Sequence, residues 1–150
     1  TILQKVVDKG ATMTTICTLN NEAVFEEAQK FSSQIKLLGV TYLTSWNSTD
    51  LKNIINQNAM LMWRENINKI KKYDFAGVVC SPKDLDTVNT LAPDMLKVCP
   101  GIGQNKGQTR TTSAKEAQDL GANYLIIGRT ITQSYDPVTE LRHIRNSLSA

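Results

Sequence analysis

Short, continuous runs of apolar residues recur along the chain. The clearest runs cover 36–44, 76–80, 96–99 and 123–128, and a weaker one covers 2–7. Strands that are buried on both faces of a parallel sheet have continuous apolar runs, whereas strands with one face in water alternate apolar and polar residues. The pattern therefore predicts five strands of a parallel sheet.

Segments with the apolar spacing of amphipathic helices lie between these runs. Two of them, 48–55 and 61–70, precede the run at 76–80, and the second ends at Lys71 and Lys72, where cations suit the helix dipole. Ser, Asn and Asp cap helix N-termini with a side-chain oxygen, and Pro fits the first turn. On this basis we expect four further helices, starting at Asn21, Ser81, Ser113 and Asp136.

Strands that alternate with helices at this spacing predict right-handed βαβ units and an α/β fold. Two architectures fit a single domain over residues 1–150. One is a five-stranded doubly wound domain. The other is a partial TIM (β/α)8 barrel, with five of the eight units of a fold that takes about 250 residues when complete. Both place a ligand at the carboxyl ends of the strands.

Composition narrows the range of partners. The chain has 17 basic and 14 acidic residues, a net charge of +3, and no basic run longer than Lys71-Lys72. We therefore expect neither nucleic acid nor a membrane as a partner, since both require larger basic patches or long apolar stretches. The N-terminal residues lack the apolar stretch of a signal peptide.

Cysteine and histidine usage limits the chemistry. Cys17, Cys80 and Cys99 are odd in number and widely spaced, which fits no disulfide framework and no metal-binding pair. His143 is the only histidine, and its place on the last predicted helix favours a surface position. We expect no metal and no cofactor, a cytoplasmic location, and packed thiols at Cys80 and Cys99.

The predicted strand ends carry the candidate ligand contacts. Gly128 lets a phosphate approach the backbone, and Arg129 beside it has two N–H groups that can bind the phosphate oxygens. The alternative is a turn glycine followed by a solvated arginine. The loop 101–107 contains three glycines and the amides of Gln104 and Asn105, so it either covers a ligand or is a plain surface loop. Asp8-Lys9 after the weak first strand is either a catalytic pair or a turn.

Four motifs together resemble one enzyme family. They are VTYLTSW at 40–46, AGVVCS at 76–81, PGI at 100–102 and YLIIGRTIT at 124–132, and they occur in this order. The set resembles the orotidine 5'-phosphate decarboxylase family, which makes UMP from OMP. The resemblance covers nearly the whole chain and favours the barrel architecture. It implies that the five βα units of this chain correspond to the fourth to eighth units of the family's barrel.

The resemblance implies a set of substrate contacts. Ser45 resembles the residue that binds the pyrimidine amide edge, and Pro100 the residue that lines the base pocket. Gln104 is the candidate for the glutamine that joins phosphate to base, and Gly128 and Arg129 resemble the phosphate site. OMP or a UMP-like nucleotide is the ligand that the resemblance implies.

The chain departs from the family pattern in several places, and one of them is Asp8-Lys9, which stands where the family often has an Asn/His pair. Gly103 stands where an arginine is common, Thr130 replaces the proline that usually follows Gly-Arg, and the loop 103–108 is shorter than the family's lid. The family's catalytic Asp-x-Lys-x-x-Asp run is absent. Asp50-Leu51-Lys52 resembles its start but lacks the second aspartate, so no catalytic residue is assigned.

Three hypotheses remain from the sequence. The chain is the phosphate- and base-binding half of a decarboxylase, an inactive nucleotide-binding half-barrel or structural remnant, or a self-contained doubly wound domain. Five strands taken from an eight-stranded barrel leave two open edges, near 2–7 and 123–127, and deprive inner residues such as Val40, Val78 and Ile126 of partners. We therefore expect a homodimer or an association with an N-terminal half, and no decarboxylation by the isolated chain.

Overall fold

A single parallel sheet forms the centre of the molecule. The computed structural model describes residues 1–41, 49, 59–103 and 112–149. Within them the strands are arranged in sequence order, each paired in parallel with the next. They are β1 (Met13–Cys17), β2 (Lys36–Val40), β3 (Gly77–Val79), β4 (Leu96–Cys99) and β5 (Tyr124–Leu125).

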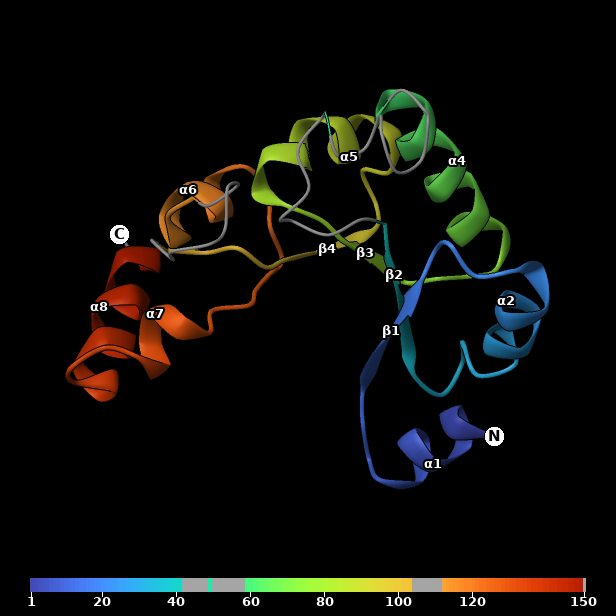
Figure 1. The fold of residues 1–150 in the computed structure, drawn as a ribbon, viewed down its shortest axis with the longest axis horizontal. Coiled ribbons are helices and arrows are strands. Elements are labelled where there is room, and N and C mark those ends of the chain that lie inside the picture. Colours follow the sequence, from blue (N-terminus) through green and yellow to red (C-terminus); the bar gives the residue numbers. More distant parts are fainter. Residues whose placement is uncertain (42–48, 50–58, 104–111, 150) are drawn as a thin grey trace.

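Helices connect the strands and follow one another along an arc, with α1 near one end and α8 near the other (Figure 1). Their bounds are α1 (Ile2–Asp8), α2 (Glu22–Gln29), α4 (Ala59–Lys72), α5 (Leu85–Leu91), α6 (Ala114–Asp119), α7 (Arg129–Thr132) and α8 (Pro137–Leu148), with a 3-10 turn at Pro82–Asp84 before α5. None of the helices within the described residues is long and apolar enough to cross a membrane.

The strand order separates the two architectures that the sequence left open. In a doubly wound sheet the order reverses at a switch point and helices cover both faces. Here the order runs from β1 to β5 without reversal, and α2, α4, α5 and α6 all contribute to one core on one face of the sheet. The predicted parallel α/β fold with the layout of a partial barrel is therefore confirmed.

The two faces of the sheet bury different side chains. Leu37, Val78 and Cys99 pack against the helices, whereas Leu38, Val79 and Val98 form a smaller cluster on the opposite face. Val78 was expected on the inner face, and that expectation is wrong: its side chain is 0% exposed among the helices. Successive side chains of a strand point to opposite faces, so its neighbour Val79 takes the inner position.

The predicted strand at 2–7 is wrong, because these residues form α1. Thr1 caps the helix by accepting a hydrogen bond from the Gln4 amide, and Leu3, Val6 and Val7 pack against the core at helical spacing. Asp8 is the last residue of α1, and the chain turns at Lys9 and Gly10. The φ of Gly10 is +78°, and the Asp8-Lys9 pair therefore ends a helix and not a strand. The first strand is β1. This edge strand is partly exposed, and its sequence MTTIC has no continuous apolar run, so the apolar pattern did not predict it.

The predicted caps are confirmed where the structure describes them. Asn21, Ser81, Ser113 and Asp136 each accept a backbone N–H in the first turn of their helix. The prediction for 61–70 is confirmed within α4, which extends further at both ends. The predicted segment 48–55 lies outside the described residues except for Thr49.

Two buried threonines tie the carboxyl ends of the strands together. The Thr18 hydroxyl donates to the Val40 carbonyl at 3.0 Å, and the Thr41 hydroxyl donates to the Val79 carbonyl at 3.4 Å. The Lys69 ammonium group donates to the Thr18 carbonyl at 3.0 Å. The edge of the sheet where barrel enzymes bind ligands is therefore held by side chains as well as by the strand ladder.

Candidate functional site

The segments that follow β4 and β5 lie side by side. Cys99 pairs with Leu125 in the sheet, and the Ile126 amide donates to the Cys99 carbonyl at 2.9 Å. Beyond β4 the chain continues through Pro100 and Gly101 to the buried Ile102. Beyond β5 it reaches α7. Parallel strands end at the same edge of a sheet, so the two predicted contact segments meet there.

Backbone contacts fix the segment after β4. Gly101 and Gly103 both have positive φ angles, of +81° and +88°. The Gly103 amide donates to the Thr112 carbonyl at 2.8 Å, and the Thr112 amide donates to the Gly101 carbonyl at 3.3 Å. These bonds hold both ends of the loop whose central residues, 104–111, lie outside the described residues.

Gly128 and Arg129 form the turn from β5 into α7. The Gly128 carbonyl accepts hydrogen bonds from the Ile131 and Thr132 amides at 2.9 and 3.1 Å, which forms the single turn of α7. Among the residues that the structure describes, leaving aside its two chain neighbours, no heavy atom lies within 4 Å of where a Cβ of Gly128 would be. A ligand can therefore reach this part of the backbone, with the exposed Arg129 next to it.

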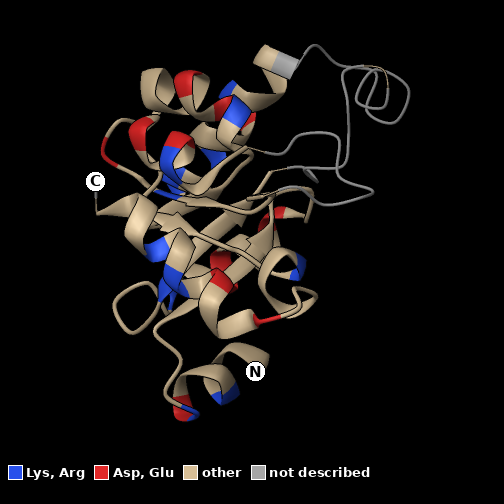
Figure 2. Cartoon of the chain, turned by 90° about the vertical axis from the view of Figure 1, so that its left-hand side faces the viewer, with Lys and Arg blue, Asp and Glu red and all other residues tan. Residues whose placement is uncertain are grey.

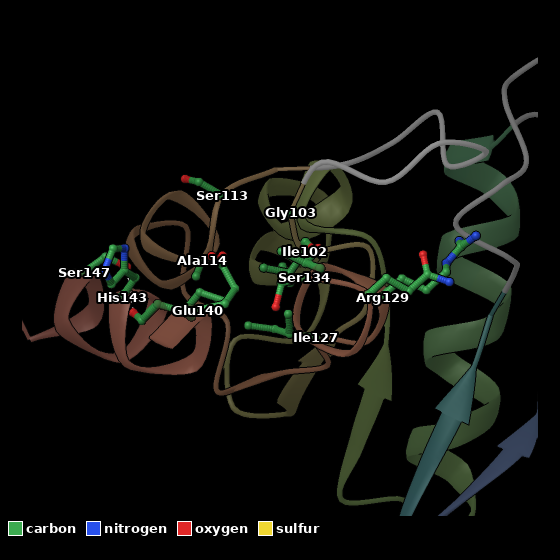
Figure 3. Close-up of a pocket in the computed structure, with 13 residues that line it drawn as sticks. Ile102, Gly103, Ser113, Ala114, Ile127, Arg129, Ser134, Glu140, His143 and Ser147 are labelled. Atoms are coloured by element: carbon green, nitrogen blue, oxygen red, sulfur yellow. Dashed lines mark hydrogen bonds between the residues drawn. The ribbon is translucent and has the colours of Figure 1, made fainter. Parts of the chain in front are cut away.

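A groove of about 780 Å³ lies between α6, α7 and α8. Ser113, Glu140, His143 and Ser147 are among its polar lining residues. Figure 3 shows that the Arg129 side chain points away from the end of the groove formed by His143 and Ser147, and toward the side of the molecule where β2 and α4 lie. Arg129 also lines this groove, and its guanidinium group extends away from the His143 end, on the side of β2 and α4.

The structure brings together part of the predicted substrate site. Pro100, Gly128 and Arg129 lie at neighbouring strand ends, as the sequence predicted. Ser45 and Gln104 lie outside the described residues. The Thr130 hydroxyl donates a hydrogen bond to the Ile102 carbonyl at 3.2 Å, a contact that was not predicted from the sequence and whose only signals were the departures from the family motif at positions 103 and 130.

The thiols at the strand ends are packed, as predicted. Cys80 and Cys99 are buried with their sulfur atoms 3.9 Å apart. The hydrogen bond between the thiols, together with burial, raises the pKa of Cys80, so this group stays protonated. His143 lies exposed on α8, as predicted. No group of three or more His, Cys, Asp or Glu side chains gathers as a metal site within residues 1–41, 49, 59–103 and 112–149.

Basic and acidic residues are interspersed along the helices (Figure 2). Several of them pair on the surface, including Lys72 with Glu22 at 3.0 Å and Lys115 with Asp119 at 2.9 Å. Exposed pairs of this kind contribute little to stability. The charge that matters for an anionic ligand is therefore local, at Arg129 beside the strand ends.

Comparisons with known proteins agree on one family. The family model described as "Orotidine 5'-phosphate decarboxylase / HUMPS family" matches residues 2–144. An orotidine 5'-phosphate decarboxylase of Staphylococcus epidermidis is 35% identical over 137 residues, which are 83% of this chain and 59% of the relative. One of Dictyoglomus thermophilum is 33% identical, covering 97% of this chain and 66% of the relative.

Solved structures show the same likeness in three dimensions. The crystal structure of orotidine 5'-phosphate decarboxylase from Lactobacillus acidophilus matches with a TM-score of 0.78 and 26% identity, over 97% of this chain and 66% of that chain. The enzyme from Metallosphaera sedula, at 22% identity and a TM-score of 0.69, shares the fold. The chain spans about half to two thirds of the length of the curated relatives that it matches.

Proposed function

The chain belongs to the orotidine 5'-phosphate decarboxylase / HUMPS family, and we propose that it carries the phosphate- and base-binding part of an orotidine 5'-phosphate decarboxylase in UMP biosynthesis. The adjacent ends of β4 and β5 are the observation that carries this proposal. Gly128, with its open backbone, and the exposed Arg129 follow β5 at this edge, and barrel enzymes commonly bind phosphate at the corresponding edge, which supports the proposal.

The two residues act on phosphate in different ways. Gly128 has no side chain to keep a phosphate oxygen from the backbone, and Arg129 supplies a permanent positive charge with paired N–H donors. Pro100, at the end of the neighbouring strand, lines the pocket for the pyrimidine ring. In this proposal Ser45 binds the amide edge of the base and Gln104 joins base to phosphate; both lie outside the described residues.

Binding of UMP tests the phosphate site. We expect Arg129→Ala to weaken UMP binding by about 1.5–3 kcal/mol, the contribution of a charge-assisted hydrogen bond. Arg142→Ala is the matched control, because Arg142 is an exposed arginine on α8 away from the strand ends. Isothermal titration calorimetry measures both. UMP affinity that is unchanged in the Arg129 variant would show that the phosphate binds elsewhere.

Turnover requires residues that this sequence does not contain. The Asp-x-Lys-x-x-Asp run is absent from the 150 residues, and fixed charges of that kind supply most of the stabilisation of such a transition state. We therefore expect no decarboxylation of OMP by these residues alone, measured as loss of OMP absorbance. Steady OMP loss that stops when a residue of this chain is mutated would contradict the prediction.

An inactive nucleotide-binding half-barrel is the second candidate, and the missing catalytic run is the observation that favours it. The two candidates predict different results when the remaining βα units of a family member are supplied as a separate polypeptide. Recovered OMP turnover supports the decarboxylase. UMP binding without turnover in that mixture supports the inactive binding module.

A further inference from the structure

Thr130 connects the two segments that form the proposed phosphate site. It is the second residue of α7, and its hydroxyl donates a hydrogen bond to the Ile102 carbonyl at 3.2 Å. Ile102 is only 3% exposed, so its carbonyl group has limited access to water. The bond joins the helix that follows β5 to the segment that follows β4.

Gly103 allows this contact by lacking a side chain. A Cβ at position 103 would lie 2.3 Å from the Thr130 hydroxyl oxygen and 2.8 Å from its methyl carbon. The φ of +88° at Gly103 also disfavours any L-residue with a side chain. Positions 103 and 130 are two of the places where the chain departs from the family motif, and the structure puts them in direct contact.

The backbone hydrogen bonds that close the turn of α7 lie within the turn itself. The amides of Ile131 and Thr132 bond to the Gly128 carbonyl, and the Gln133 amide bonds to the Arg129 carbonyl. A single helical turn with such local bonds is marginal by itself. A side-chain bond from this turn to a buried carbonyl of the next strand end therefore restricts how Gly128 and Arg129 are oriented.

We propose that Thr130 is a positioning residue of the phosphate site, which holds α7 so that Gly128 and Arg129 face the ligand together. The inference rests on the proposed function. Thr130 acts through its neighbours and touches no phosphate itself. If α7 is already ordered in the free protein, ligand binding does not have to supply the free energy of ordering it. The affinity for the ligand is then higher, because a preorganised site loses less entropy on binding.

The affinities for UMP and uridine, measured by calorimetry, test this role. Thr130→Val keeps the shape of the side chain but removes the hydroxyl, and we expect about three- to tenfold weaker UMP binding with uridine binding unchanged. Thr130→Ser keeps the hydroxyl and should restore the UMP affinity. Thr132→Val is the matched control, because among the described residues the Thr132 hydroxyl bonds within its own turn, to the Gly128 carbonyl at 3.4 Å.

Trypsin cleavage after Arg129, followed by mass spectrometry, provides a second readout without ligand. Thr130→Val should speed this cleavage relative to wild type and Thr132→Val, because α7 opens more often once its tie to Ile102 is lost. This measurement keeps the proposal testable if the valine variant binds no nucleotide for reasons of folding.

The outcomes separate this inference from the function on which it rests. Equal affinities for UMP and uridine in the wild type would overturn the phosphate site and the positioning role together. A wild type that prefers UMP, with the same preference and the same cleavage rate in Thr130→Val, would overturn the positioning role alone. Failure of Thr130→Ser to restore the affinity would overturn it as well.

Discussion

At the scale of single residues, the three cysteines differ because of their surroundings. Cys17 is exposed on the edge strand β1, whereas Cys80, directly after β3, and Cys99, at the end of β4, are buried beside each other. Thiolates are the reactive form of cysteine, and both burial and the thiol–thiol hydrogen bond keep Cys80 protonated. One exposed thiol and two packed thiols are therefore expected to react at very different rates.

Alkylation measures this difference. We expect N-ethylmaleimide at neutral pH to modify Cys17 quickly in the native chain, and Cys80 and Cys99 only after denaturation. Cys17→Ser should remove the fast phase and leave the slow one. Rapid native labelling at Cys80, located by mass spectrometry, would show that the strand ends open far more than their packing indicates.

Local signals explain which residues could be predicted from sequence. Gly128 and Arg129 stand next to each other at a strand end, so one short motif located both of them. The bond between Thr130 and Ile102 joins residues 28 apart in sequence and depends on how two loops approach each other. No periodicity or propensity encodes such an approach, and only the departures from the family motif at 103 and 130 indicated it.

At the scale of elements, the same distinction applies to helices and strands. Asn21, Ser113 and Asp136 were predictable as caps because capping involves bonds over two or three residues. The edge strand β1 could not be predicted in the same way, because its Thr-rich sequence becomes a strand by pairing with β2 in the folded sheet. The apolar run at 2–7 was misassigned since short apolar runs occur in helices as well as in strands.

The start of α8 has a pH dependence that can be measured. Asp136 accepts hydrogen bonds from the Thr139 hydroxyl and from the Thr139 and Val138 amides, which hold its pKa below the usual value. A lowered pKa in the folded state means that the charged cap stabilises α8 above the unfolded value of about 3.9, and that this contribution is lost as pH falls further.

Urea unfolding of wild type and Asp136→Asn between pH 3 and pH 7 tests this cap. Asparagine caps a helix without titrating, so we expect any stability advantage of the wild type to shrink as pH falls below about 4. The other carboxylates titrate alike in both proteins, so their contributions to the free energy of unfolding cancel in the comparison. A difference that stays constant over this range would show that the Asp136 charge does not stabilise α8.

At the scale of the whole molecule, both ends of the sheet are open within the described residues. β1 and β5 each have one strand neighbour, and α1 and α8 stand at the ends of the arc (Figure 1). Large apolar side chains are exposed in these regions: Ile2 by 82%, Ile126 by 51%, Val138 by 57% and Leu141 by 44%. A groove of about 630 Å³ between α1, β1 and α2 adds further uncovered apolar surface, including Leu3, Val6 and Val24.

These surfaces have a common physical consequence. Parallel sheets are normally buried on both faces, and an unpaired edge offers backbone groups to any strand that can pair with it. The relatives exceed this chain in length by about a third to a half of their own chains. We infer that further βα units, from the same polypeptide or from another, cover these ends, and that the 150 residues alone cover them by self-association.

Analytical ultracentrifugation at micromolar concentration tests this assembly. We expect the 150-residue chain to sediment as a dimer or larger species and not as a 16.7 kDa monomer. Val138→Lys and Leu141→Lys add charge to the exposed face of α8 and should shift the population toward monomer, because burying an unpaired lysine is costly. Thr90→Lys adds the same charge on the exposed side of α5 and should leave the mass distribution unchanged. A cooperatively folding monomer would show instead that the open edges are stable in water, and that completing the barrel is not required for folding.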